Sequence, residues 1–414
     1  GATLGRGDGG APAAGAIPTA PTGAAVPVAP GDVARLEGHL GRHPDDAGAW
    51  AALGSALVER ARVTADPSLY PRAEGAFDRS LTLQPEANLA ALMGRGALAN
   101  ARHDFAAGLG WGQRAASLNP NSPEVHAVVG DALVELGRYE EAFEAYQTMV
   151  DIAPGLASYT RAAYALDLQG DTVGAQGVLE LALADIRAPQ RRAFALTALG
   201  DQAWATGNLD EARVRYEEAA ALDADSVGPT AGLARVAGAS GDVDTAVRHW
   251  RRVVERAPLP EYVAEFGTLL EAEGRPVEAD DQYALLDVQR RLLEASGVNG
   301  DLELALSSAD RGVGLAVGLE AARAEWARRQ SIHAADALAW QLHAHGQNRE
   351  ALGFADRALR LGTKNASFLF HRARIRSALG DATGAQDDFE AAAAANPYFS
   401  PRWAPALQDA LARP

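Results

Sequence analysis

Residues 123–156 carry the sequence PEVHAVVGDALVELGRYEEAFEAYQTMVDIAPGL, and this stretch decides the fold. Gly137 lies between its two halves, and glycine there ends a first helix because it accepts a left-handed backbone conformation without a Cβ penalty. Gly130 and Ala142 are small, which lets two helices approach closely where they cross. Pro154 ends the second helix, since proline lacks a backbone N–H. The stretch therefore predicts two helices joined by a tight turn.

The same pattern recurs along the chain at a nearly constant spacing. The aligned small residues are Gly54, Gly96, Gly130, Ala163, Gly200, Ala234, Gly267, Ala305, Ala339 and Ala373, at spacings of 33 to 42 residues that are mostly 33 or 34. Glycine separates the two halves of most copies, and Asp171, Asp242 and Asp381 follow such glycines directly. These aspartates are expected to cap the second helices by accepting hydrogen bonds from free backbone N–H groups. The chain is thus predicted to be a long array of one helical unit.

These residues resemble the tetratricopeptide repeat family, whose period is 34 residues. The resemblance covers nearly all of residues 32–414. It implies an all-α fold, a right-handed superhelical solenoid of about ten helix-turn-helix units with a capping helix at each end. In four motifs the chain is also similar to a group of exported bacterial repeat proteins. The motifs are residues 301–306, 309–312, 336–340 and 396–401. The resemblance supplies no catalytic residues.

The repeat pattern divides the chain into five stretches. These are a disordered tether (1–31), an N-terminal capping helix (32–46), repeats one to seven (47–297), repeats eight to ten (298–400) and a C-terminal capping helix (401–414). The tether consists mostly of Gly, Ala, Pro and Thr, a composition that cannot bury enough apolar surface to fold. Three irregularities interrupt the period. Residues 60–72 are expected to form a longer loop, and residues 186–192 and 287–300 to lengthen links between repeats.

The composition excludes several classes of function. The formal net charge is −16 and the sequence pI is about 5.0, whereas nucleic-acid binders usually carry the opposite charge. No cysteine is present, which excludes disulfides, thiol catalysis and cysteine metal sites. No apolar run approaches the roughly 18 residues of a membrane-spanning helix. We expect no transmembrane segment and no nucleic-acid partner.

The N-terminal stretch bears on location. The chain begins at Gly1 with the tether, which suggests a removed signal peptide or membrane anchor and an extracytoplasmic or cell-envelope location. The alternative is a disordered tail on a cytoplasmic protein.

In the resembled family the first helix of each repeat lines a concave groove, so inner-facing residues of these helices are candidates for partner contact. The predicted partner-binding residues are Asp131, Tyr164, Trp204, His333, Asp336, Trp340, His343, Phe370, Arg374 and Ser377. The inferred groove is acidic in its N-terminal half. Residues 341–380 carry Lys364 and six arginines against two acids, and we expect this end to meet an acidic segment. The alternative interpretation makes these arginines a solvated face and Trp340 packed core.

No motif for catalysis, metal or cofactor binding is found. His333, Asp336 and His343 share a stripe, but at helical rise the two histidines are about 15 Å apart, too far for one metal ion. No phosphate-binding loop, nucleophile elbow or HExxH motif is present. The sequence therefore predicts a non-enzymatic scaffold without cofactor or metal, binding a protein or peptide in its groove. The alternatives are a carrier of a peptide or small ligand in a C-terminal pocket, and a hydrolase or transferase with an unrecognised site.

Overall fold

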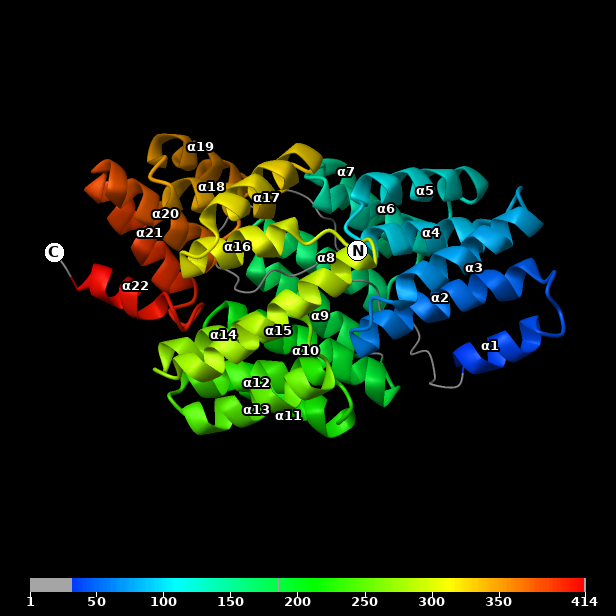
Figure 1. Cartoon of the computed structure of the whole chain (residues 1–414), viewed down its shortest axis with the longest axis horizontal. Coiled ribbons are helices and arrows are strands. Elements are labelled where there is room, and N and C mark those ends of the chain that lie inside the picture. Colours follow the sequence, from blue (N-terminus) through cyan, green and yellow to red (C-terminus); the bar gives the residue numbers. More distant parts are fainter. Residues whose placement is uncertain (1–31, 185, 413–414) are drawn as a thin grey trace. The chain divides into compact units, whose positions relative to one another are not determined.

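The structure is a computed structural model, and it describes residues 32–184 and 186–412. In this part of the chain all regular secondary structure is helical, and the helices follow one another in pairs (Figure 1). The prediction of an all-α repeat solenoid is confirmed. The predicted tether, residues 1–31, lies outside the described residues.

Ten helix pairs account for most of the described chain, with one further helix at each end. The first helices are α2 (Ala47–Thr64), α4 (Leu89–Ala101), α6 (Pro123–Glu135), α8 (Leu156–Leu168), α10 (Pro189–Ala205), α12 (Val227–Ala239), α14 (Pro260–Ala272), α16 (Asp301–Arg311), α18 (Ile332–Ala344) and α20 (Ala366–Leu379). The second helices are α3 (Leu69–Leu83), α5 (Phe105–Leu118), α7 (Tyr139–Ile152), α9 (Thr172–Ala184), α11 (Leu209–Leu222), α13 (Val243–Arg256), α15 (Pro276–Ala295), α17 (Leu315–Arg328), α19 (Asn348–Ala358) and α21 (Ala382–Ala395). Helix α1 (Asp32–Leu40) precedes the pairs and α22 (Ala404–Leu411) follows them.

The turns within the pairs have the predicted local chemistry. Gly137, Gly170 and Gly241 all have positive φ angles, of 79°, 76° and 79°, in the left-handed region that glycine tolerates best. The side chains of Asp171 and Asp242 accept hydrogen bonds from backbone N–H groups three residues on, at 2.8 and 3.1 Å. The start of each second helix is thereby fixed by residues that are adjacent in sequence.

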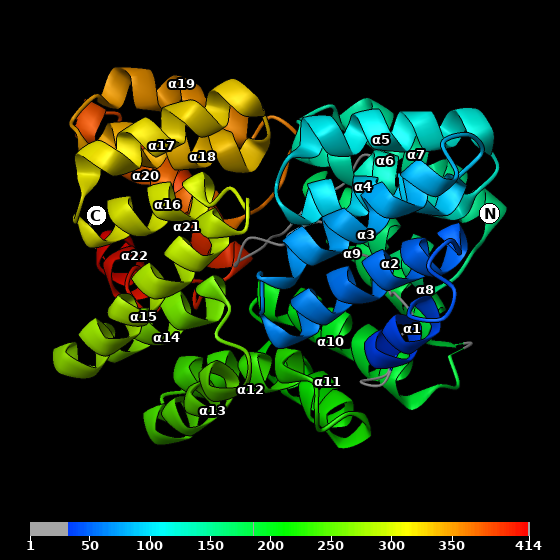
Figure 2. The ribbon, with the colours of Figure 1, turned by 45° about the vertical axis from the view of Figure 1, so that its right-hand side comes forward.

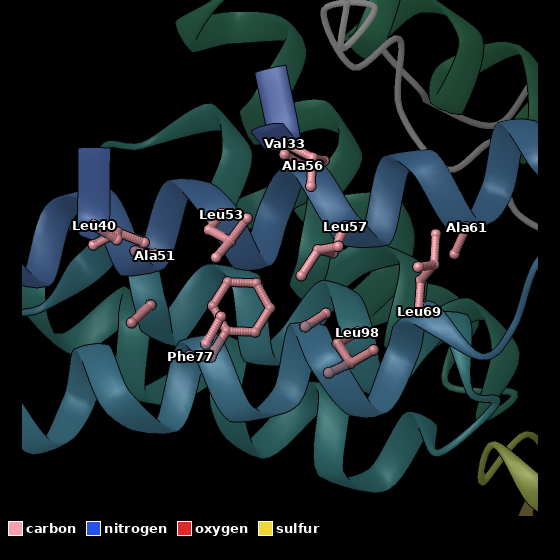
Figure 3. Close-up of a cluster of buried hydrophobic side chains, with 13 residues drawn as sticks. Val33, Leu40, Ala51, Leu53, Ala56, Leu57, Ala61, Leu69, Phe77 and Leu98 are labelled. Atoms are coloured by element: carbon pink, nitrogen blue, oxygen red, sulfur yellow. The ribbon is translucent and has the colours of Figure 1, made fainter. Parts of the chain in front are cut away.

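Each pair is held by a large ring set between small residues. Phe77 of α3 is fully buried, and a Cβ atom at Gly54 or Gly94 would lie only 2.5 or 2.1 Å from its ring (Figure 3). Tyr216 of α11 lies in the same way against Gly200 and Gly232, at 2.6 and 2.3 Å. The glycines are therefore required by ring packing between neighbouring helices, because any larger side chain would overlap the ring.

The predicted irregularities fall mostly in helices. Residues 60–72 are not a long loop, because α2 continues to Thr64 and α3 begins at Leu69. Likewise, residues 287–295 extend α15, and residues 189–192 belong to α10. The insertions thus lengthen existing helices, which leaves fewer backbone groups without hydrogen-bond partners than a loop would.

The described chain forms two compact units. Residues 159–287 and 301–412 make up the larger unit, and residues 32–158 with 288–300 make up the smaller unit. Each contains a contact between segments far apart in sequence. In the smaller unit His103 Nδ1 donates to the Asn299 carbonyl oxygen at 2.7 Å, 196 residues away. In the larger unit Asn396 Nδ2 donates to the Trp204 carbonyl oxygen at 2.9 Å, 192 residues away. In both units the turn after a first helix meets a link more than five repeats further on.

Candidate functional site: the inner helices of the larger unit

A row of charged side chains crosses the first helices of repeats four to eight in the larger unit. We call it the acidic ladder. Its members are Asp167 (α8), Asp201 (α10), Arg235 (α12), Glu261 and Glu265 (α14) and Glu303 (α16). Neighbouring helices are joined by contacts about one repeat apart in sequence. Gln202 Nε2 donates to Asp167 at 3.2 Å, and Arg235 lies 3.8 Å from Asp201.

Arg235 is the central cation of the ladder. Its guanidinium donates two hydrogen bonds to the Glu265 carboxylate, at 2.6 and 2.7 Å, in the fork-to-fork geometry typical of strong arginine pairs. The side chain is only 12% exposed, whereas that of Asp201 is 53% exposed. Tyr216 also donates to Asp201, at 2.8 Å. The five carboxylates are thus matched by a single guanidinium, and the ladder keeps an excess of negative charge.

The surroundings oppose ionisation of these carboxyls. Loss of bulk water raises the pKa of Asp167 to about 6 and that of Glu261 to about 7, and neighbouring Glu303 adds to the shift at Glu261. The pKa of Asp201 is raised for the same reason. Glu261 and Asp201 nevertheless have exposed side chains. Carboxyls that water can reach but that protein surrounds on several sides are what a concave wall provides.

Seven of the ten predicted partner-binding residues have buried side chains, namely Asp131, Tyr164, Trp204, His333, Asp336, Trp340 and Phe370. Burial lowers the pKa of His333 to about 3 and keeps its ring neutral. As folded, these residues are packing residues, and they could meet a partner only if the fold opened. His343 and Arg374 are half-buried and Ser377 is exposed, so partner contact by these three stays a prediction.

Five residues of the larger unit meet around the Trp340 ring. His371 stacks on it with ring centroids 4.0 Å apart, and His343 stacks on it at 5.0 Å. Asp336 accepts a hydrogen bond from His371 Nδ1 at 2.9 Å. Asp310 accepts from the Trp340 indole at 2.8 Å and from the Trp403 indole at 2.9 Å. The packed-core interpretation of Trp340 is therefore the one that the structure supports.

Two arginines of the expected cationic end are paired within the chain. Arg372 donates to both oxygens of Asp388, at 2.9 and 2.7 Å, and Arg376 lies 3.0 Å from the same carboxylate. Asp388 is itself only 3% exposed. The local charge balance of residues 341–380 counted these cations as available, but their counter-charge comes from α21, beyond that window.

The ladder shows what sequence reasoning missed. Asp167 and Asp201 were recognised as inner-facing, but Arg235, Glu261, Glu265 and Glu303 were not. A usable signal exists, because Asp201 and Arg235 are 34 residues apart and Arg235 and Glu265 are 30 apart. Opposite charges one repeat apart on first helices lie side by side once the repeats stack.

Two further searches cover only residues 32–184 and 186–412. No helix among them is both long and apolar enough to cross a membrane. No group of three or more His, Asp or Glu side chains there could hold a metal ion.

Comparison with known proteins identifies one repeat directly. Residues 123–155 match the tetratricopeptide repeat family model. No curated protein sequence matches the chain.

Solved structures with a similar course of the chain include the Cut9–Hcn1 hetero-tetramer of APC/C, at 14% identity over 92% of this chain and 80% of that chain, with a TM-score of 0.42. PilF of Pseudomonas aeruginosa aligns at 16% identity over 54% of this chain and 96% of its own, with a TM-score of 0.37. The type IV pilus biogenesis factor PilW aligns at 17% identity over 53% and 98%, with a TM-score of 0.40. Likenesses of this size carry no inference about what the chain binds.

Proposed function

We propose that this chain, a helical solenoid containing a tetratricopeptide repeat, is a non-catalytic scaffold that holds a basic segment of a partner protein along the acidic ladder. Repeat solenoids of this kind generally bind proteins on the inner faces of their first helices. The observation that carries the proposal is the charge imbalance of the ladder, five carboxylates against Arg235, on helices whose side chains remain accessible.

Charge complementarity decides the chemistry of the partner. An extended segment with several arginines or lysines would supply the cations that the ladder lacks, and each new pair would form where bulk water is partly excluded. An acidic segment would add repulsion to carboxyls whose ionisation is already opposed. The ladder therefore favours a basic segment over the acidic one expected from the arginines of residues 341–380.

Binding of a fluorescent nona-arginine peptide tests the proposal. We expect Asp201→Asn and Glu261→Gln each to weaken binding about three- to tenfold at low salt, because each removes one partly desolvated attraction. Binding to the unaltered chain should weaken as salt is raised. Fluorescence anisotropy measures both effects.

Matched controls separate the ladder from general attraction to an acidic protein. Glu217→Gln and Glu218→Gln change the net charge by the same amount, but both side chains are exposed on the second helix α11. We expect them to leave affinity within about twofold, as typical for screened surface charges. Equal losses in all four variants would show that the peptide follows net charge alone, and the ladder would not be the site.

Binding should also depend on pH. The carboxyls of Glu261 and Asp167, with pKa values raised to about 7 and 6, gain negative charge as pH rises from 5 to 8, while nona-arginine keeps its charge. We expect affinity to increase about tenfold over this range. Titration at constant ionic strength measures the increase, and Glu261→Gln should remove most of it above pH 6. An unchanged pH profile in that variant would contradict the assignment.

A further inference from the structure

The motif at residues 396–401 has no part in the acidic ladder, but it contacts distant repeats of the larger unit. Asn396, which is fully buried, donates to the carbonyl oxygen of Trp204 at the end of α10. At neighbouring Gly207, a Cβ atom would lie 3.1 Å from Pro397. The last repeat is thus joined directly to the fifth.

Residues just after the motif continue this connection. Arg402 forms an ion pair of 2.5 Å with Glu271 near the end of α14, and Tyr283 donates to the same carboxylate at 2.8 Å. The Trp403 indole donates to Asp310 of α16, which also holds Trp340. Figure 2 shows α22, which follows these residues, beside α14 and α15. Residues 396–403 therefore join the last repeat to repeats five, seven and eight.

This connection is polar and incompletely packed. A cavity of about 280 Å³ lies beside it, lined by Glu271, Ala272, Pro401, Arg402 and Pro405. Arg402 Nε is buried and has no hydrogen-bond partner among the described residues. Half-exposed ion pairs and single hydrogen bonds contribute little net stability, unlike an apolar interface. Such a contact can open without unfolding the repeats that it joins.

Its position relates it to the ladder. Trp204 lies less than one turn beyond Asp201 on α10, and Glu271 lies on α14 with Glu261 and Glu265. Arg402 therefore brings a cation of the chain itself to a helix that carries ladder carboxylates.

We propose that residues 396–403 form a clasp that holds the larger unit closed and opens to admit the partner segment to the acidic ladder. This inference rests on the proposed function for its ligand, but the closure itself is measurable without any ligand. Because the chain contains no cysteine, spin labels can be attached at chosen sites. Asp210→Cys and Tyr398→Cys place two labels at exposed positions, one on α11 and one in the clasp.

Two variants open the clasp without changing net charge. Asn396→Ala removes the bond to Trp204, and Trp403→Phe removes the indole donor to Asp310. We expect each to increase the open population about fivefold, the effect of one lost hydrogen bond. Pulsed electron–electron distance measurement should then show a second, longer distance between the labels. The control is Asn208→Ala, which removes only the cap of α11.

Nona-arginine measures the consequence for binding. The association rate should rise with the open population in both clasp variants and stay unchanged in Asn208→Ala. Label distances unchanged in both variants would overturn the clasp. Separated labels with an unchanged association rate would overturn its role in admission. If nona-arginine bound none of these proteins, the proposed function would fail, and the label distances would still decide whether the clasp opens.

Discussion

Replacing Phe77 with alanine is expected to destabilise the smaller unit by about 3–5 kcal/mol. The ring is fully buried and fills the space between α2, α3 and α4, where two glycines lie against it (Figure 3). Those glycines have no side chains that could move into the cavity. The cost should therefore lie toward the upper part of this range. Urea unfolding followed by circular dichroism measures the loss.

A solenoid need not unfold in one step, so the location of the loss matters as well as its size. Hydrogen exchange should show the greatest loss of protection in α2–α4. The control Val63→Ala removes an apolar side chain from α2 that is 60% exposed, and should change stability by less than about 0.5 kcal/mol. Equal effects of the two substitutions would mean that Phe77 does not hold the first two repeats together.

Replacing Asp388 with alanine is expected to cost about 3 kcal/mol. Its carboxylate is buried and accepts hydrogen bonds from Arg372, with Arg376 3.0 Å away. Without it, two guanidinium groups that are only about a fifth exposed, at 19% and 23%, lose their main counter-charge. Hydrogen exchange should show lost protection in α20, α21 and α22, accompanied by a lower thermal midpoint.

Asp387 offers a control at the adjacent position. Its side chain is exposed, so Asp387→Ala removes the same charge without leaving a buried cation unpaired. We expect a change of less than about 0.5 kcal/mol. If both alanine variants were equally stable, the arginines of α20 would be a solvated face, free to meet an acidic partner.

The repeat and its turns could be predicted from sequence because they depend on neighbouring residues. A glycine at a positive φ angle and an aspartate that caps the next helix act within a few positions, as at Gly170 and Asp171. The pairing of a large ring with small residues also lies within one repeat or its neighbour. Each copy repeats the same local physics, so the array was predictable even where single copies are irregular.

The candidate site was less predictable, since exposure on a first helix depends on repeats far away in sequence. Trp204 and Trp340 have the spacing of inner-facing residues, yet both are buried. Asp201 has the same kind of spacing and stays exposed. No local pattern distinguishes these outcomes, because residues 396–403 approach α10 and α16 only after several repeats have stacked.

The sequence by itself determined the helical hairpin, its period of about 34 residues and the chemistry of its turns. The tertiary structure alone decided that Asn396 meets Trp204, that Asp310 holds two indoles and that Arg235 lies among five carboxylates. The physical reason is accumulation. Each repeat adds a small rotation to the last, and their sum over five repeats, which no single repeat encodes, determines which distant side chains meet.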